Sequence, residues 1–154
     1  MTIENGGAGT GGFTTKPMPA TAPVGDPKIT AFGHAIWLMT HSPIHKHLFM
    51  TDADWLVLPA ISLEQYKLWT REGRPYGFAS WAFLGPDAEA RIKQGIRRIM
   101  PIDWKSGDAL WLIDFIAPFG GQQEMLAELR QHLGGRPLKS LQPGPDGKLA
   151  VMEW

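Results

Sequence analysis

A histidine and an aspartate, far apart in the chain, have side chains that could carry acid-base chemistry. His45 follows the break in "GHAIWLMTHSPIHKH", where the chain leaves a predicted helix and the side chain can face a cleft. Asp114 interrupts the apolar run "WLIDFIAPFGG". A lone ionised carboxylate in a buried strand is very costly, so Asp114 needs a partner. A His–Asp pair would supply a base near neutral pH, with the carboxylate fixing the tautomer and supporting the imidazolium.

A second interpretation of Asp114 stays open from the residues alone. A structural aspartate could instead accept backbone N–H bonds or meet an arginine or lysine. The other histidines suggest less chemistry, because His34 is typical of a core histidine and His47 and His132 are typical of the surface.

A metal site is not expected. His41 and His45 have the i, i+4 spacing of a metal-binding pair, but Pro43 breaks the helix that would make this spacing useful. The chain has no cysteine, and nothing indicates where a third ligand would lie.

The composition limits the classes of protein to consider. The 154 residues fit one domain, and fifteen basic residues balance fifteen acidic ones, so the chain lacks the field of a nucleic-acid binder. No apolar run is long enough to span a membrane, and no secretory signal is recognisable. We expect a soluble, cytoplasmic protein.

The first 27 residues are rich in glycine and proline and predict a flexible lead, followed by one folded domain over residues 28–154. Gly7, Gly9 and Gly12 match a G-x-G-x-x-G pattern within the lead. A dinucleotide fingerprint must follow a strand and open a helix, so we interpret this pattern as linker composition.

The periodicity beyond the lead predicts elements that would position the two side chains. A helix begins near Ile29 and ends near His41, because Pro43 disfavours the helical conformation at Ser42. The elements expected after it are a strand over 55–64, a β-hairpin over 64–84, a helix over 85–100, a strand over 108–118, a helix over 120–135, and short strands over 136–144 and 148–154.

This order predicts an α/β fold with a mixed sheet and a βαβ unit near residues 108–142. The period of two in the strand over 108–118 places Leu112, Asp114 and Ile116 on one face. Trp111, Ile113 and Phe115 would lie on the other face.

Three segments resemble, in order and spacing, the RTX toxin-activating lysine acyltransferases: "FGHAIWLMTHSPIHKH", "VLPAISLEQYKLWTREGRPYGFASWAFL" and "WKSGDALWLIDFIAPFGG". The resemblance implies a cytoplasmic, GNAT-like enzyme that moves a fatty acyl chain from acyl carrier protein to internal lysines of an RTX-type protoxin, and it suggests a homodimer. The family's catalytic histidine lies in S-P-[LI]-H, matched by residues 42–45, and its aspartate in I-D-[WF]-I-A-P-F-G, matched by residues 113–120. His45 and Asp114 fall on these two sites.

The chemistry of that reaction suits these side chains. A lysine amine is protonated at neutral pH and needs a base or a desolvating site before it attacks a thioester. His45 would take the proton, or attack first and carry the acyl group, and Asp114 would hold and polarise it. Ser42 would hydrogen-bond the substrate or the thioester oxygen, or only end the helix.

The donor is expected to be acyl carrier protein bearing a phosphopantetheine thioester, with no permanently bound cofactor. Gly120 and Gly121 could present backbone N–H groups to its single phosphate at a helix N-terminus. One predicted helix is basic, and its charged face could bind the acidic carrier protein or could simply be solvated. The residues are Arg91, Lys93, Arg97 and Arg98. Five aromatic residues are expected to lie mostly in the core, and some of them could line an acyl channel. They are Trp37, Trp69, Phe78, Trp81 and Trp111.

Two alternatives remain. The protein could be a module that binds acyl carrier protein without catalysis, or an N-acyltransferase whose acceptor is not a toxin.

Overall fold

The computed structural model describes residues 25–154, so the glycine pattern of the lead and the predicted flexibility of residues 1–24 lie outside the described residues. The elements are α1 (Pro27–His41), η1 (Met50–Asp52), α2 (Ala53–Leu56), α3 (Leu58–Ser62), β1 (Tyr66–Arg71), β2 (Arg74–Leu84), α4 (Pro86–Lys93), η2 (Pro101–Trp104), β3 (Ala109–Ile116), α5 (Gln122–His132), β4 (Lys139–Pro143) and β5 (Leu149–Glu153).

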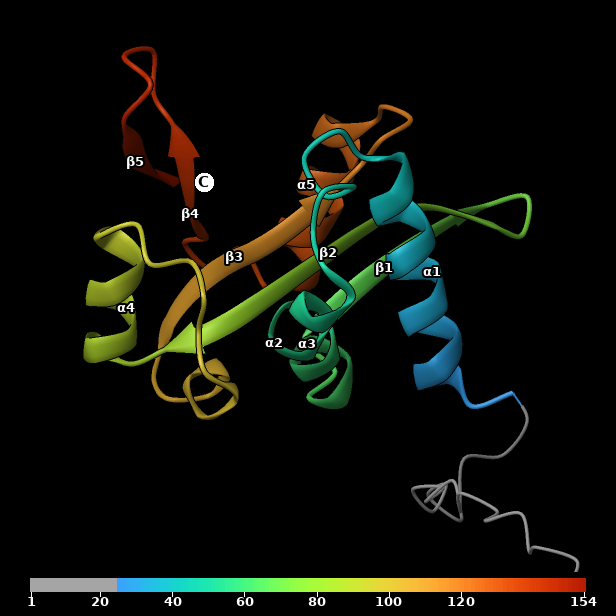
Figure 1. Cartoon of the computed structure of the whole chain (residues 1–154). Coiled ribbons are helices and arrows are strands. Elements are labelled where there is room, and N and C mark those ends of the chain that lie inside the picture. The colour runs from blue at the N-terminus through green and yellow to red at the C-terminus, as the bar shows by residue number, and fades with distance from the viewer. Residues whose placement is uncertain (1–24) are drawn as a thin grey trace, which may run out of the picture.

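The strands form one mixed sheet in the order β1-β2-β3-β4-β5 (Figure 1). Neighbouring strands are antiparallel except for β3 and β4, which are parallel and are joined by α5. The predicted βαβ unit, the hairpin and the α/β class with a mixed sheet in a single domain are therefore confirmed. The arrangement is compatible with a GNAT-like fold.

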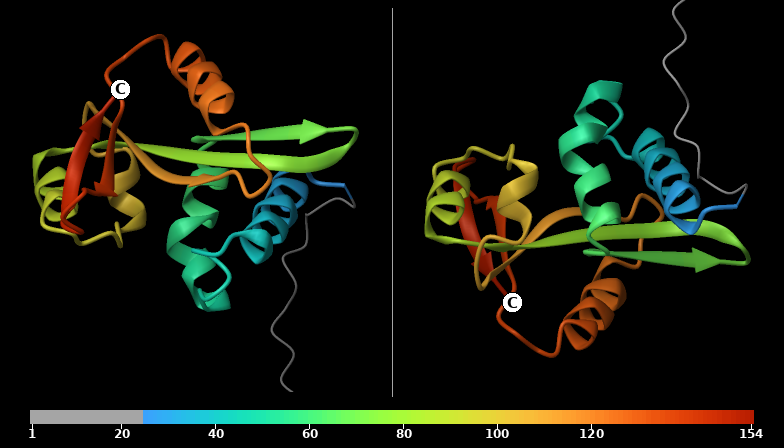
Figure 2. Two further views of the ribbon diagram at one scale, coloured as in Figure 1. Left: turned by 90° about the horizontal axis from the view of Figure 1, so that it is seen from above. Right: turned by 90° about the horizontal axis from the view of Figure 1, so that it is seen from below.

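Helices cover both faces of the sheet. Figure 2 shows α5 on one face and α1, α2 and α3 on the other. On the α1 face, Leu38 packs in one cluster with Phe78 and Ile116. On the α5 face, Leu129 packs with Trp81. The central strands are thus buried from both sides, which explains why their sequences are apolar on both faces.

A β-bulge interrupts the pairing of β2 with β3. Ser80 pairs with Asp114, but the next residue, Trp81, pairs with Leu112, which leaves Ile113 as an extra residue. Leu112 consequently packs with the cluster under α5, whereas Asp114 lies on the α1 face with Ile116. The predicted grouping of Leu112 with Asp114 and Ile116 is therefore wrong at Leu112. The predicted grouping of Ile113 with Phe115 is wrong too, because Ile113 packs with the α1 cluster and Phe115 with the α5 cluster.

The strand predicted over 55–64 is also wrong, because this segment forms α2 and α3. Pro59 lies in the first turn of α3, where its missing N–H group has no helical partner to lose. The buried residues follow a helical rather than an alternating spacing: Leu56, Val57, Ala60 and Ile61.

The C-terminal ends of α1 and α4 can also be compared with the prediction. The first helix ends at His41, as expected. The helix predicted over 85–100 stops at Lys93, and Gly95 follows with a φ of 90°. Arg97 and Arg98 therefore lie beyond the helix.

Candidate functional site

The turn that follows α1 places His45 against the sheet. Ser42 leaves the helical conformation with a φ of −95° and a ψ of 124°, as the following Pro43 requires. The chain then turns tightly, because the backbone N–H groups of His45 and Lys46 both donate to the Ser42 carbonyl, at 3.2 and 3.0 Å. This turn brings the imidazole underneath the helix end and over β3.

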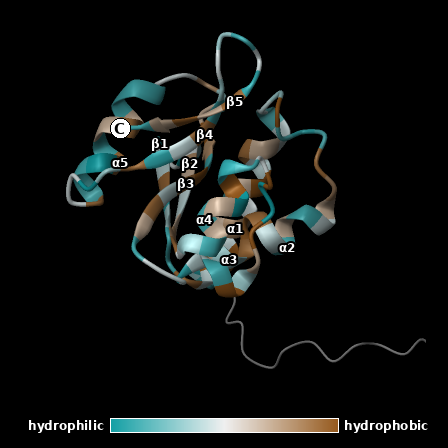
Figure 3. Ribbon diagram, turned by 90° about the vertical axis from the view of Figure 1, so that its left-hand side faces the viewer, coloured by the Kyte–Doolittle hydropathy of each residue, from teal (hydrophilic) through white to brown (hydrophobic). Residues whose placement is uncertain are grey.

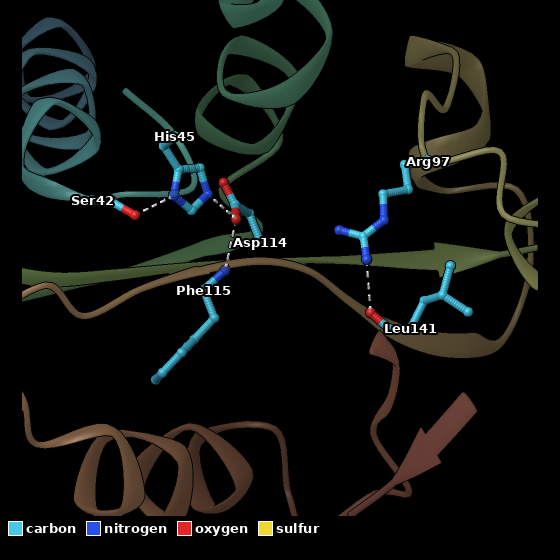
Figure 4. A network of polar contacts seen from close by, with 6 residues as sticks. All are labelled: Ser42, His45, Arg97, Asp114, Phe115 and Leu141. Atoms are coloured by element: carbon cyan, nitrogen blue, oxygen red, sulfur yellow. Dashed lines mark hydrogen bonds and ion pairs between the residues drawn. The ribbon is translucent and has the colours of Figure 1, made fainter. Parts of the chain in front are cut away.

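Three side chains form a continuous polar chain at this point (Figure 4). The His45 Nε2 atom lies 2.8 Å from Asp114 Oδ1, and the His45 Nδ1 atom lies 2.7 Å from Ser42 Oγ. The side chains of His45 and Asp114 are only 9% and 11% exposed, and Ser42 is buried. The structure thus brings together the three residues that the sequence singled out in two distant motifs.

The hydrogen-bond chemistry fixes the direction of this chain. With an ionised carboxylate, which only accepts, and a neutral imidazole, the His45 Nε2–H group donates to Asp114 and the Nδ1 atom accepts from the Ser42 hydroxyl. Asp114 Oδ1 accepts a second bond from the Phe115 backbone N–H at 2.9 Å. Serine, histidine and carboxylate are linked in the same order as in the triads that activate a serine or pass on a proton.

Ser80 is a polar neighbour of this chain that the sequence did not predict. It pairs with Asp114 across β2 and β3 and is fully buried. Neither its hydroxyl nor Asp114 Oδ2 has a hydrogen-bond partner within residues 25–154. The signal was a single serine in the apolar run "GFASWAF", but only the strand register places it opposite Asp114.

The structure does not assemble the predicted basic helix face. Arg91 pairs with Asp103, and Lys93 lies 3.4 Å from Glu89. Arg97 lies outside the helix and donates to the Leu141 carbonyl, as Figure 4 also shows. The remaining member, Arg98, lies over the ring of Trp55. Lys93, Arg97 and Arg98 are exposed, which favours the alternative of a solvated face.

Gly120 and Gly121 lie in the turn between β3 and α5, and Gly121 lines a different hollow from the one that His45 lines. Their φ angles are 90° and 79°, which a residue with a Cβ atom rarely adopts. Gly121 is the N-cap of α5 and lines a hollow with Arg71. The acidic residues Glu124 and Glu128 line the same hollow. Phosphate binding at this turn stays a prediction.

Most of the predicted aromatic set is core. Phe78, Trp81 and Trp111 are buried, so they are not free to line a channel. Trp37 is half exposed, with its ring 4.2 Å from that of His41. Trp69 donates its indole N–H to Glu128.

The described part of the chain contains no group of three or more histidine, cysteine, aspartate or glutamate residues that could hold a metal ion. The His41 Nδ1 atom lies 2.9 Å from the Trp37 carbonyl oxygen, within its own helix. No helix within residues 25–154 is both long and apolar enough to cross a membrane.

Comparison with known proteins gives consistent matches. Residues 26–153 match the sequence model of the HlyC family, described as the RTX toxin acyltransferase family. The RTX-I toxin-activating lysine-acyltransferase ApxIC of Actinobacillus pleuropneumoniae is 34% identical over 125 residues, which cover 79% of this chain and 73% of the relative. The protein-lysine myristoyltransferase RtxC of Kingella kingae is 31% identical over 126 residues, covering 80% and 75%. The protein-lysine myristoyltransferase HlyC of Escherichia coli is 34% identical over 113 residues, covering 73% and 66%.

Proposed function

Because the chain belongs to the RTX toxin acyltransferase family and is an acyltransferase enzyme, we propose that it moves a fatty acyl group from acyl carrier protein to internal lysine ε-amines of an RTX-type protoxin. The names of the relatives supply the lysine acceptor, and two of them name a myristoyl group. The reaction would take place in the cytoplasm, before the acceptor leaves the cell. The observation that carries the proposal is the buried chain Ser42–His45–Asp114.

In the proposed mechanism His45 acts as the base and Asp114 holds it. The Nε2–H group is committed to the carboxylate, so the basic lone pair is on Nδ1, facing Ser42. The acceptor lysine releases one proton to water on entering the desolvated site and attacks the thioester carbon as a neutral amine. As the C–N bond forms, a second proton passes from nitrogen through the Ser42 hydroxyl to Nδ1. The C–S bond breaks, and the imidazolium returns this proton to the leaving thiolate.

The geometry favours this base mechanism over attack by the imidazole itself. Both ring nitrogens are already engaged, one by Ser42 and one by Asp114. An acyl-imidazole would require one of these bonds to break. Intact-mass analysis of the enzyme with acyl carrier protein bearing a myristoyl chain, in the absence of acceptor, is therefore expected to show no acyl adduct.

The decisive experiment supplies acyl carrier protein bearing a myristoyl chain together with a protoxin encoded next to this gene. Mass spectrometry should find the acyl mass on lysine, and His45→Ala should stop the transfer. His47→Ala is the matched control, because His47 is exposed. If the wild-type protein binds the carrier but transfers nothing, the non-catalytic binding module replaces this proposal. If lysines of another protein are modified instead, the acceptor is not a toxin.

The donor would bring its own phosphopantetheine, so no bound cofactor is required. Gly120 and Gly121 would receive its phosphate at the start of α5, supported by Arg71 and opposed by the two carboxylates in the same hollow. Gly121→Ala should then raise the KM for the carrier and leave the KM for the acceptor at its wild-type value.

The homodimer suggested by the family has a surface that would suit it. β5 is an edge strand of the sheet with exposed apolar side chains at Leu149, Val151 and Met152. Sedimentation of the wild-type protein and of Val151→Lys would test this assembly.

A further inference from the structure

A small apolar pocket adjoins the catalytic chain on the side of α1 and α2. Its wall comes mostly from apolar side chains, among them Ile36, Met39, Leu48, Phe49, Ala53 and Leu56. His45 belongs to the same wall. A ligand in this pocket would therefore lie against His45.

Two charged residues line this wall, Asp52 and Lys46, and both carboxylate oxygens of Asp52 already accept hydrogen bonds. Asp52 accepts from the Phe49 backbone N–H at 2.8 Å and from the Trp55 indole N–H at 3.0 Å. Lys46 is exposed, so its ammonium group can stay in water while its stem covers apolar surface. The interior of the pocket thus offers an apolar ligand no unpaired acidic group.

The mouth of the pocket exposes side chains that a soluble protein normally buries. Phe49 is 78% exposed and Met50 is 72% exposed, and both line the pocket. Figure 3 shows hydrophobic residues, in brown, around α1 and α2. Exposed apolar residues beside a cavity are typical of a ligand site, and methionine adapts readily to a flexible chain.

From these observations we propose that this pocket binds the fatty acyl chain of the donor, holding the thioester carbonyl at His45 and the chain along Met39, Ala53 and Leu56. The inference rests on the proposed acyl transfer and adds the site that recognises the chain. The cavity measures about 90 Å³, well below the roughly 300–1,000 Å³ that encloses a drug-sized ligand. A long chain would therefore extend from the pocket along its mouth, where the exposed side chains of Phe49 and Met50 can move to cover it.

The pocket should also select chain length, because its inner wall is built from buried residues that pack in the core. Ala53 and Leu56 are both buried, and Leu56 and Met39 belong to the same core cluster as Leu38. Adding methylenes at Ala53 would shorten the space left for the ligand. A difference of a methylene or two in an apolar pocket changes discrimination by about ten- to a hundredfold.

The test compares transfer from acyl carrier protein loaded with butyryl and with myristoyl chains. Ala53→Leu is expected to lower kcat/KM for myristoyl about ten- to a hundredfold relative to butyryl. Ala127→Leu is the matched control, because Ala127 is exposed on α5 across the sheet. Phe49→Ser and Met50→Ser, at exposed positions that should not affect folding, are expected to raise the KM for the myristoyl donor alone.

The assignment would be overturned if Ala53→Leu kept wild-type thermal stability and lost the same factor in kcat/KM with both donors. It would also be overturned if Ala53→Leu changed only the KM for the acceptor. A binding measurement separates this inference from the proposed function. The myristoyl chain should tighten binding of the carrier to the wild-type protein and not to Ala53→Leu, whether or not transfer occurs. If the wild-type protein transfers nothing yet shows this difference, the pocket stands and the proposed reaction fails.

Discussion

At the scale of single residues, the direction of the hydrogen bonds at His45 decides what each neighbour can do. Asp114 occupies the Nε2 side, so the side on which a substrate proton can arrive is the one that Ser42 faces. Ser42 is therefore placed as a relay as well as the residue at which α1 ends. The helix-ending and substrate-contacting interpretations of Ser42 do not exclude each other.

Asp114→Asn should separate the charge of this residue from its shape. The amide would donate to Nε2 and force the imidazole proton onto Nδ1, which removes the base from the side of Ser42. We expect the rate of acyl transfer to fall by about 10³- to 10⁴-fold, by analogy with the wrong tautomer in serine hydrolases. Initial rates and circular dichroism would check this, and a loss smaller than tenfold with an intact fold would contradict the assigned tautomer.

Ser42→Ala should remove the relay and leave the base. Loss of a positioned proton-transfer group costs about 10²- to 10⁴-fold in rate, and the buried Nδ1 atom would lose its donor. Ser42→Thr keeps the hydroxyl and should retain part of the activity. If alanine and threonine behave alike in a full pH–rate profile, the hydroxyl takes no part in proton transfer.

At the scale of elements, α4 is tied to the sheet by one carboxylate. Glu89 accepts from Lys139 on β4 at 2.6 Å and from the Trp111 indole N–H on β3 at 3.2 Å. The hydrogen bond from Lys139 lowers the pKa of Glu89 below its ordinary value of 4.5, with the Trp111 bond adding to it against the opposing effect of burial. Deprotonated Glu89 thus stabilises the fold at neutral pH.

The stability that Glu89 contributes should disappear in acid. A lowered folded-state pKa gives a contribution that is complete above the unfolded value of 4.5 and is lost as the pH falls through the lower folded value. Glu89→Gln should reduce the free energy of unfolding by about 1–3 kcal/mol at pH 7, and the difference should shrink below pH 4.5. Urea unfolding at several pH values would measure it. Glu153→Gln, on exposed β5, is the control and should show no such trend.

The elements also show which features the sequence could predict. Asp114 needed a partner because a buried carboxylate is costly, and Pro43 had to end α1 before His45; both followed from single residues. The bulge at Ile113 could not be predicted from the sequence of β3, because an extra residue is defined only by how β3 pairs with β2. The segment around Pro59 read as a strand because its apolar residues are nearly continuous, and such runs do not distinguish strand from helix.

At the scale of the molecule, the site exists only when α1 is packed against the central strands of the sheet. His45 follows α1 and Asp114 lies on the central strand, 69 residues further along the chain. Their contact is long-range, so no local fragment can hold it. We expect the loss of activity in urea to follow the same midpoint as tryptophan fluorescence, as in two-state unfolding. Activity lost at clearly lower urea would indicate a site that opens before the core.

The hairpin of β4 and β5 is attached more loosely than the rest of the sheet. β4 pairs with β3 at one ladder position, Trp111 with Lys139, while β5 is exposed along its length. Its connecting turn, residues 144–148, is closed by its own bond from the Gly144 N–H to the Lys148 carbonyl at 2.7 Å. Exposed turns of this kind tolerate inserted residues. A cysteine placed there, in a chain that has no other, would take a single fluorescent label and report encounters with the carrier protein without touching His45.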